Sequence, residues 1–179
     1  MPSSFPFYKV NVDGAIFKNK KKAGVGVVIW DLVGNFIVGL SKKFGCPLGA
    51  IEVEAKTFEF GLEFAKNMDI QEFVLEGDSL NIAHALCGHS HATSTITTLI
   101  YRVQVTSYEF QNVLFSHVRR NDNMPAHQLA KHALGIFDFS IWIEKRVPVF
   151  LNRLFSMMYL LLLIINEVCV FYIKNTYIL

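Results

Sequence analysis

The alternating sequence YKVNVDG at residues 8–14 decides the fold. Its tyrosine and two valines fall on one face, and its lysine, asparagine and aspartate fall on the other. Alternation with a period of two is typical of a β-strand that buries one face. The stretch therefore predicts a strand that ends on an aspartate, Asp13.

Three predicted strands form an antiparallel meander from this point. The lysine-rich residues 18–22 predict a hairpin loop, and the valine-rich residues 24–30 predict the second strand. The sequence DLVGN at 31–35 is typical of a turn, and residues 36–41 follow as the third strand. Consecutive strands joined by short turns favour antiparallel pairing.

A helix and a buried strand follow the meander. Apolar residues recur every three or four positions between 51 and 65, which predicts a helix over residues 50–68. The short apolar run at 73–75 predicts a buried strand that stops at an acid, Asp78. The remaining predicted elements are a helix capped by Ser79 that ends near residue 86, a helix over 95–107, a strand over 110–118 and a helix over 123–134.

These elements predict an α/β domain in which helices flank a central sheet. Its five-stranded mixed sheet is expected to have three antiparallel strands followed by two parallel strands. A right-handed crossover through the helix over 50–68 places the fourth strand parallel beside the first. Because α/β folds place their sites where parallel strands end, Asp13 and Asp78 are expected at the same edge of the sheet.

A third carboxylate, Glu54, lies in the first turns of the predicted helix and close to the same edge. Three acids repel one another unless a cation neutralises them, and hard oxygen ligands suit Mg²⁺ or Mn²⁺. Each acid alone has a simpler explanation, because a strand-terminal aspartate often caps a turn and a glutamate at a helix start interacts favourably with the helix dipole. The three acids together favour a metal site.

The composition is that of one globular domain followed by an apolar segment. The chain has 179 residues, of which 52% are hydrophobic and 18% are charged. These values exclude disordered and collagen-like chains, and three cysteines are too few for a disulfide scaffold. Residues 154–179 are mostly apolar and contain two charged residues, Glu167 and Lys174.

The net charge of +2 is too small to indicate a nucleic-acid-binding protein by itself. The basic residues nevertheless gather in two places, where they can contact phosphates. Solvated loops explain them equally well. The residues concerned are Lys18, Lys20, Lys21 and Lys22 in the predicted hairpin, and Arg119 and Arg120 after the last predicted strand.

The cysteines and the N-terminal residues bear on location. Cys46, Cys87 and Cys169 leave one cysteine unpaired in any pairing, which favours a reducing compartment. The N-terminal residues show no basic region followed by an apolar run, so we expect no signal peptide. These features favour an intracellular location, in the cytoplasm or the nucleus.

Several motifs of the chain resemble those of type 1 ribonuclease H domains. NVDGA at 11–15 and GVGVVI at 24–29 are similar to the first hairpin of that family. VEA at 53–55 is similar to its acidic helix, and EGDS at 76–79 matches the aspartate motif of its fourth strand.

The last motif resembles the plant branch of the family, whose members often derive from retroelements. FSHVRR at 115–120, followed by NMPAHQLAK at 123–131, is similar to the last strand and helix of that branch. The resemblance covers residues 7–150, which we expect to form the ribonuclease H-like domain. Residues 151–179 remain as a hydrophobic C-terminal tail.

The resemblance implies a metal-dependent endonuclease that hydrolyses the RNA strand of RNA–DNA hybrids with two divalent ions, Mg²⁺ or Mn²⁺. Carried over by position, Asp13 would bridge both ions and Glu54 would hold one of them. Asp78 would help to bind the other ion or the attacking water. Asn123 is expected at the nucleic acid together with the basic residues named above, and we expect the protein to be a monomer.

One position departs from the family, because His127 stands where the family has its fourth acid. A neutral imidazole can ligate Mn²⁺ but is a poor Mg²⁺ ligand, and it brings no negative charge. His127 is therefore a candidate site residue that implies altered metal binding, impaired activity or no activity. The other interpretation is a solvated residue at the start of a helix, without a role.

Two alternatives to an active nuclease remain. The first is a catalytically inactive nucleic-acid-binding module of retroelement origin that kept the fold after losing the fourth acid. The second is a membrane-tethered protein in which the tail matters most.

The tail itself has three explanations. Residues 155–173 approach the length of about 20 residues that spans a bilayer as a helix, but Asn166 and Glu167 interrupt them. The segment is a membrane anchor, a helix that folds onto its own domain, or translated non-coding sequence at the end of an incomplete gene model. We favour the third explanation, because nothing patterned follows the region where the resemblance fades.

Overall fold

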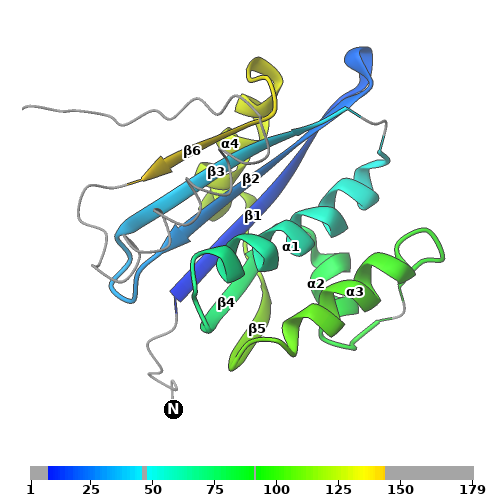
Figure 1. Ribbon diagram of the computed structural model, residues 1–179. Coiled ribbons are helices and arrows are strands. Elements are labelled where there is room, and N and C mark those ends of the chain that lie inside the picture. Colours follow the sequence, from blue (N-terminus) through cyan, green and yellow to red (C-terminus); the bar gives the residue numbers. More distant parts are fainter. Residues whose placement is uncertain (1–7, 46–47, 91, 144–179) are drawn as a thin grey trace, which may run out of the picture.

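A six-stranded mixed sheet forms the centre of the computed structural model, which describes residues 8–45, 48–90 and 92–143 (Figure 1). The strands lie in the order β5-β4-β1-β2-β3-β6. Their bounds are β1 Tyr8–Phe17, β2 Lys22–Trp30, β3 Phe36–Phe44, β4 Glu72–Gly77, β5 Asn112–His117 and β6 Phe139–Ile143. The predicted mixed sheet is therefore confirmed, with one strand more than expected.

Among the described residues, four α-helices flank the sheet, with α1, α2 and α3 on one side and α4 on the other (Figure 1). Short 3-10 turns precede and follow α4. The helices are α1 Ala50–Asn67, α2 Leu80–Leu86, α3 Thr97–Ser107 and α4 Met124–His132, and the 3-10 turns are η1 Lys18–Lys20, η2 Arg120–Asn123 and η3 Ala133–Gly135.

The predicted meander is present, but β1 does not end at Asp13. It continues to Phe17, and its last residues pair with β2 as far as Phe17 opposite Lys22. The hairpin closes within η1 and Lys21, whose left-handed backbone (φ 49°) allows a tight turn. Because the loop is this short, the residues between Asp13 and the turn have partners in β2, and Lys22 belongs to β2.

The predicted crossover is confirmed. The chain leaves β3, passes through α1 and returns as β4, which pairs in parallel with β1 from Tyr8 opposite Phe73 to Val12 opposite Gly77. β5 then pairs in parallel with β4. The core lies between this sheet and α1, and its fully buried side chains include Val12, Phe58 and Phe73.

The expectation of a five-stranded sheet was wrong, because β6 adds a sixth strand. β6 pairs antiparallel with β3, from Lys42 opposite Phe139 to Val38 opposite Ile143. The alternating sequence FSIWI at 139–143 fits a strand, and it satisfies the backbone groups of β3 that would otherwise be exposed at the sheet edge. Five residues after a helix are too few for the pattern alone to separate a strand from a loop.

Two helix ends also differ from expectation. Ser79 occupies the N-cap position of α2, but its side chain makes no capping hydrogen bond. The helix predicted over 123–134 is divided, because α4 ends at His132 and the chain continues as η3.

No helix among the described residues is long and apolar enough to cross a membrane. The tail over 151–179, its candidate span over 155–173 and the domain boundary at residue 150 all lie outside the described residues.

Candidate active site

Three carboxylates converge at the end of the paired segment of β1 and β4. Asp13, Glu54 and Asp78 each offer an oxygen atom, and these oxygens all lie within 4.8 Å of one another. The convergence expected from the sequence is therefore present in the structure.

The parallel pairing of β1 and β4 places two of these acids. The pairing ends at Val12 opposite Gly77, and Asp13 and Asp78 are the residues that directly follow this last pair. Gly77 must be small here, because a Cβ atom at this position would lie 2.7 Å from the ring of Phe58. The Asp13 side chain is almost fully buried, and its Oδ1 accepts a hydrogen bond of 2.9 Å from the backbone N–H of Gly14.

Burial and neighbouring negative charges raise the pKa values of Glu54 and Asp13. Burial raises the pKa of Glu54 to about 8, and the charges of Asp13 and Asp78 add to the effect. Burial and the nearby Asp78 also raise the pKa of Asp13, against the opposing hydrogen bond from His127. A protein without metal therefore holds a proton on Glu54 at neutral pH, and a divalent cation would relieve the repulsion.

His127 belongs to this cluster. It lies on α4, its side chain is buried, and its Nδ1 lies 2.5 Å from Oδ2 of Asp13. The interpretation of His127 as a solvated residue is therefore wrong. α4 can bring it so close because Gly26, opposite Asp13 in β2, has no side chain: a Cβ atom there would lie 2.1 Å from the carbonyl oxygen of Ala126.

Arg120 reaches the cluster from η2. One guanidinium nitrogen lies 3.9 Å from Oδ2 of Asp78, and the other lies 3.4 Å from Nδ1 of His127. Its neighbour Arg119 is exposed and makes no side-chain hydrogen bond or ion pair with another described residue. Of the two predicted basic residues, Arg120 is the one that the fold brings to the acids.

The expected contact between Asn123 and nucleic acid needs correction. Asn123 is fully buried, and its side-chain N–H donates a hydrogen bond of 2.9 Å to the backbone carbonyl of Val12. It faces the sheet, because η2 turns inward beside β1. Asn123 therefore anchors η2 next to Asp13, and its side chain does not reach a bound nucleic acid.

The predicted lysines lie outside the cluster, at the far end of the β1–β2 hairpin. Lys18, Lys20 and Lys21 are exposed, and Lys22 is half-buried. β1 ends at Phe17, four residues beyond Asp13, and the hairpin turn follows it. Those residues span about 14 Å of extended strand. The lysines can therefore contact phosphates distant from the acids, but not at the acids themselves.

The donor set of the cluster fits a divalent metal ion. Asp13, Glu54 and Asp78 supply oxygen ligands, which Mg²⁺ and Mn²⁺ prefer, and Glu54 and Asp13 are destabilised as anions when no cation is bound. His127 occupies one oxygen of Asp13, so an ion at that oxygen must share it with the imidazole or displace it.

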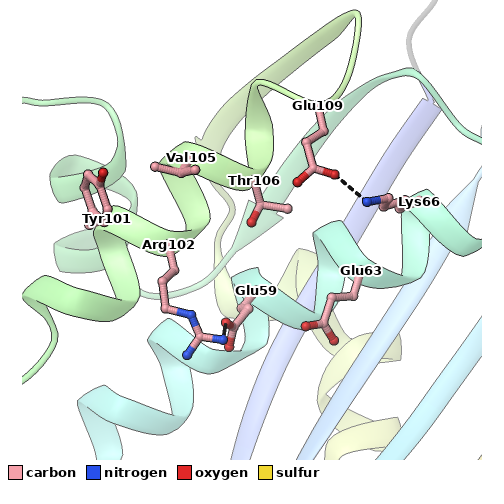
Figure 2. Close-up of a pocket in the computed structure, with 8 residues that line it drawn as sticks. All are labelled: Glu59, Glu63, Lys66, Tyr101, Arg102, Val105, Thr106 and Glu109. Carbon is pink, nitrogen blue, oxygen red and sulfur yellow. Dashed lines mark hydrogen bonds and ion pairs between the residues drawn. The ribbon is translucent and has the colours of Figure 1, made fainter.

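A separate pocket of about 330 Å³ lies between α1 and α3 (Figure 2). Ion pairs bridge it, from Arg102 to Glu59 and from Lys66 to Glu109. Residues from the later turns of α1 line the pocket, whereas Glu54 lies in the first turns of that helix. Because its charges are largely paired with one another, we interpret this pocket as the junction that holds α3 on α1.

The fold and the acid cluster define a ribonuclease H-like domain. A family model described as reverse transcriptase-like matches residues 11–133, and the chain belongs to that family. No curated protein sequence matches the chain significantly.

Solved structures of ribonucleases H share the fold. The RNase H1 of the halophilic archaeon Halobacterium salinarum is similar over 72% of this chain and 97% of its own, with 24% sequence identity and a TM-score of 0.67. LC11-RNase H1, isolated from compost and solved in complex with an RNA/DNA hybrid, has 24% identity over 72% of this chain and 96% of its own, with a TM-score of 0.65.

A viral enzyme shares the fold more distantly. The protease–reverse transcriptase of prototype foamy virus has 16% identity over 76% of this chain and 22% of its own length, with a TM-score of 0.59. At these identities the likeness concerns the fold. The site of this chain therefore has to be judged from its own residues.

Proposed function

We propose that this protein is a metal-dependent endonuclease that hydrolyses the RNA strand of RNA–DNA hybrids. The observation that carries the proposal is the convergence of Asp13, Glu54 and Asp78 within 4.8 Å on a ribonuclease H-like fold. The RNA/DNA hybrid bound to LC11-RNase H1 supports this class of substrate.

The acids have distinct parts in this proposal. Asp13 would hold both ions, Glu54 would hold one, and Asp78 would help to hold the other or the attacking water. Two bound ions would supply charge stabilisation for the attacking and leaving oxygens of the phosphate. The protein's own contribution is a rigid frame, because the end of the β1–β4 pairing and the start of α1 hold the three carboxylates in place before any ion binds.

The test is cleavage of a labelled RNA–DNA hybrid by the purified protein, in Mg²⁺, in Mn²⁺ and in EDTA. We expect cleavage with a divalent ion and none in EDTA. Cleavage in EDTA, or none under any condition, would contradict the proposal.

A second candidate is a nucleic-acid-binding module without catalysis. The observation that favours it is the hydrogen bond between His127 and Asp13, at the position where the resemblance leads us to expect an acid. Such a module would bind hybrid without cleaving it, with an affinity that falls as salt rises. Replacing Lys18, Lys20 and Lys21 by Ala would then flatten the salt dependence.

Origin, location and assembly remain proposals. A retroelement origin is supported by membership of the reverse transcriptase-like family, and we keep the plant branch as the expected source. An intracellular location, in the cytoplasm or the nucleus, agrees with the free thiol of Cys87. We keep the monomer as the expected state of assembly. The proposed domain, residues 7–150, contains every described site residue.

A further inference from the structure

The strand β5 forms one edge of the sheet (Figure 1). It pairs in parallel with β4 on one side, and no strand of the described residues lies on its other side. None of its six residues is fully buried. Within the described part of the chain, the outer side of β5 is therefore a free edge.

The pairing with β4 fixes which backbone groups face this outer side. The N–H of Asn112 donates to the carbonyl of Gln71, and the N–H of Val118 donates to the carbonyl of Gly77, each over 3.0 Å. The even-numbered residues therefore direct their backbone groups at β4. Because the direction alternates along a strand, residues 113, 115 and 117 direct theirs away from it. Among the described residues, none accepts a hydrogen bond from these three N–H groups.

Two long contacts reach the outward carbonyl groups. The carbonyl of Phe115 accepts a hydrogen bond of 3.5 Å from the thiol of Cys87, which is a weak donor and is exposed. The hydroxyl of Ser116 lies 3.5 Å from the carbonyl of His117, at the limit of a hydrogen bond. Neither contact replaces the row of donors and acceptors that a neighbouring strand supplies.

The edge also lacks the features that usually protect an exposed strand, which are proline, charged side chains and bulges. The sequence NVLFSH of β5 contains no proline, lysine, arginine or acid, and its register with β4 is continuous. Leu114 is 48% exposed and lies beside Val74, on the face of the sheet where α4 packs on β1, β2 and β3. The edge is therefore regular and partly apolar.

We propose that the outer edge of β5 binds an extended segment of a partner protein as an additional strand. An extended polypeptide is the ligand whose N–H and C=O groups recur with the spacing of those on residues 113, 115 and 117. An apolar side chain of the segment covers Leu114. An acidic side chain pairs with Arg119, which is exposed and follows the strand by two residues. The proposal does not depend on the proposed nuclease activity.

The experiment uses the full chain in EDTA, without nucleic acid, and a fluorescent peptide of alternating sequence, VTVTVTDD. The control is the same peptide with every amide N-methylated, which can donate no backbone hydrogen bond. We expect saturable binding of the first peptide and none of the second. Amide hydrogen exchange locates the site: exchange is expected to slow at residues 113, 115 and 117, and to stay unchanged at residues 114 and 116, which are already paired with β4.

Two variants at one position separate the backbone from the side chain. H117P removes an outward N–H that takes no part in the pairing with β4, whereas H117A removes the exposed imidazole and keeps that N–H. We expect H117P to weaken peptide binding by about tenfold, since a lost hydrogen bond leaves its partner unpaired, and H117A to stay within about two-fold. If the melting temperature shows that H117P does not fold, L114Q decides the question, because it removes the exposed apolar contact and is expected to weaken binding several-fold.

Four results would overturn the proposal. The first is the absence of saturable binding of the alternating peptide, and the second is equal binding of both peptides. The third is equal affinity of H117P and H117A or, where H117P is unfolded, of L114Q and the wild type. The fourth is a dimer of the wild type in analytical ultracentrifugation that H117P or L114Q abolishes, which would make the edge an interface between two copies of this chain.

Discussion

At the scale of single residues, the contact between His127 and Asp13 distinguishes this site. Nδ1 of His127 lies 2.5 Å from an oxygen of Asp13, the acid proposed to bridge two ions. An imidazole there replaces an oxygen ligand by a nitrogen ligand and removes one negative charge from the site. Mn²⁺ accepts imidazole more readily than Mg²⁺ does.

The first prediction concerns the choice of metal. We expect the wild type to cleave faster in Mn²⁺ than in Mg²⁺, and H127D to raise the rate in Mg²⁺, because the variant supplies the missing oxygen ligand. The measurement is the cleavage rate of wild type and H127D in each metal. H132D, a change of the same kind at an exposed position of α4, is the control. An unchanged Mg²⁺ rate in H127D would show that the histidine does not limit the site.

The second prediction concerns pH and the stability of the metal-free protein. The pKa of Glu54 is about 8 in the fold, above its ordinary value of 4.5. The folded state therefore binds a proton that the unfolded state has lost, and the resulting stability is full below pH 4.5 and disappears as the pH rises through 8. The glutamine of E54Q is neutral at every pH, so E54Q does not lose stability at this position as the pH rises.

The measurement is the melting temperature of wild type and E54Q in EDTA between pH 5 and 9. We expect the two curves to lie close at pH 5 and E54Q to be the more stable above pH 8. A difference that does not change with pH would contradict the raised pKa.

At the scale of elements, the close approach of α4 to β2 assembles the site. Gly24 and Gly26 leave room for α4, since a Cβ atom at either would lie within 2.3 Å of a backbone carbonyl oxygen of that helix. α4 carries His127, and Asn123 fixes the start of the helix to β1. A shift of α4 therefore moves His127 away from Asp13.

The third prediction tests this packing. G26A is expected to destabilise the protein by about 1–3 kcal/mol, the usual cost of overpacking, and to lower cleavage as α4 is displaced. The free energy of unfolding from chemical denaturation checks the first effect. G45A is the control, because nothing lies within 4 Å of a Cβ atom at Gly45. Equal stability of G26A and wild type would show that α4 can shift without loss.

Sequence pattern was sufficient for the meander, the crossover and the meeting of the three acids. Each of these depends on periodicity or on the order of elements, which a sequence displays. Pattern was not sufficient for β6, because it has only five residues and its position depends on pairing with β3. The continuation of β1 beyond Asp13 depends likewise on partners in β2.

Contacts between side chains could not be predicted from the sequence either. The motif that contains Asn123 gave no indication that this side chain faces the sheet. The two adjacent arginines look alike in sequence, and only the turn of η2 directs Arg120 to the acids. The ion pairs between α1 and α3 join residues that are distant in sequence and belong to no motif.

At the scale of the whole molecule, the acid cluster and the exposed lysines of the hairpin lie at different places along β1. The three acids lie together where the parallel strands end, and exposed lysines occupy the tip of the hairpin beyond them. This arrangement suits a polyanion that is held at its backbone by the lysines and arginines and presents one phosphate to the acids. The central claim is therefore that the acid cluster is needed for cleavage and not for binding.

The most direct test of that claim is to measure cleavage and binding of a labelled RNA–DNA hybrid with D78N. The change removes one charge from the cluster and keeps the shape of the side chain. D122N, at an exposed aspartate of the adjoining turn η2, is the control. We predict that D78N abolishes metal-dependent cleavage while binding in EDTA stays equal or becomes slightly tighter, and that D122N cleaves like the wild type. Undiminished cleavage by D78N would contradict the account.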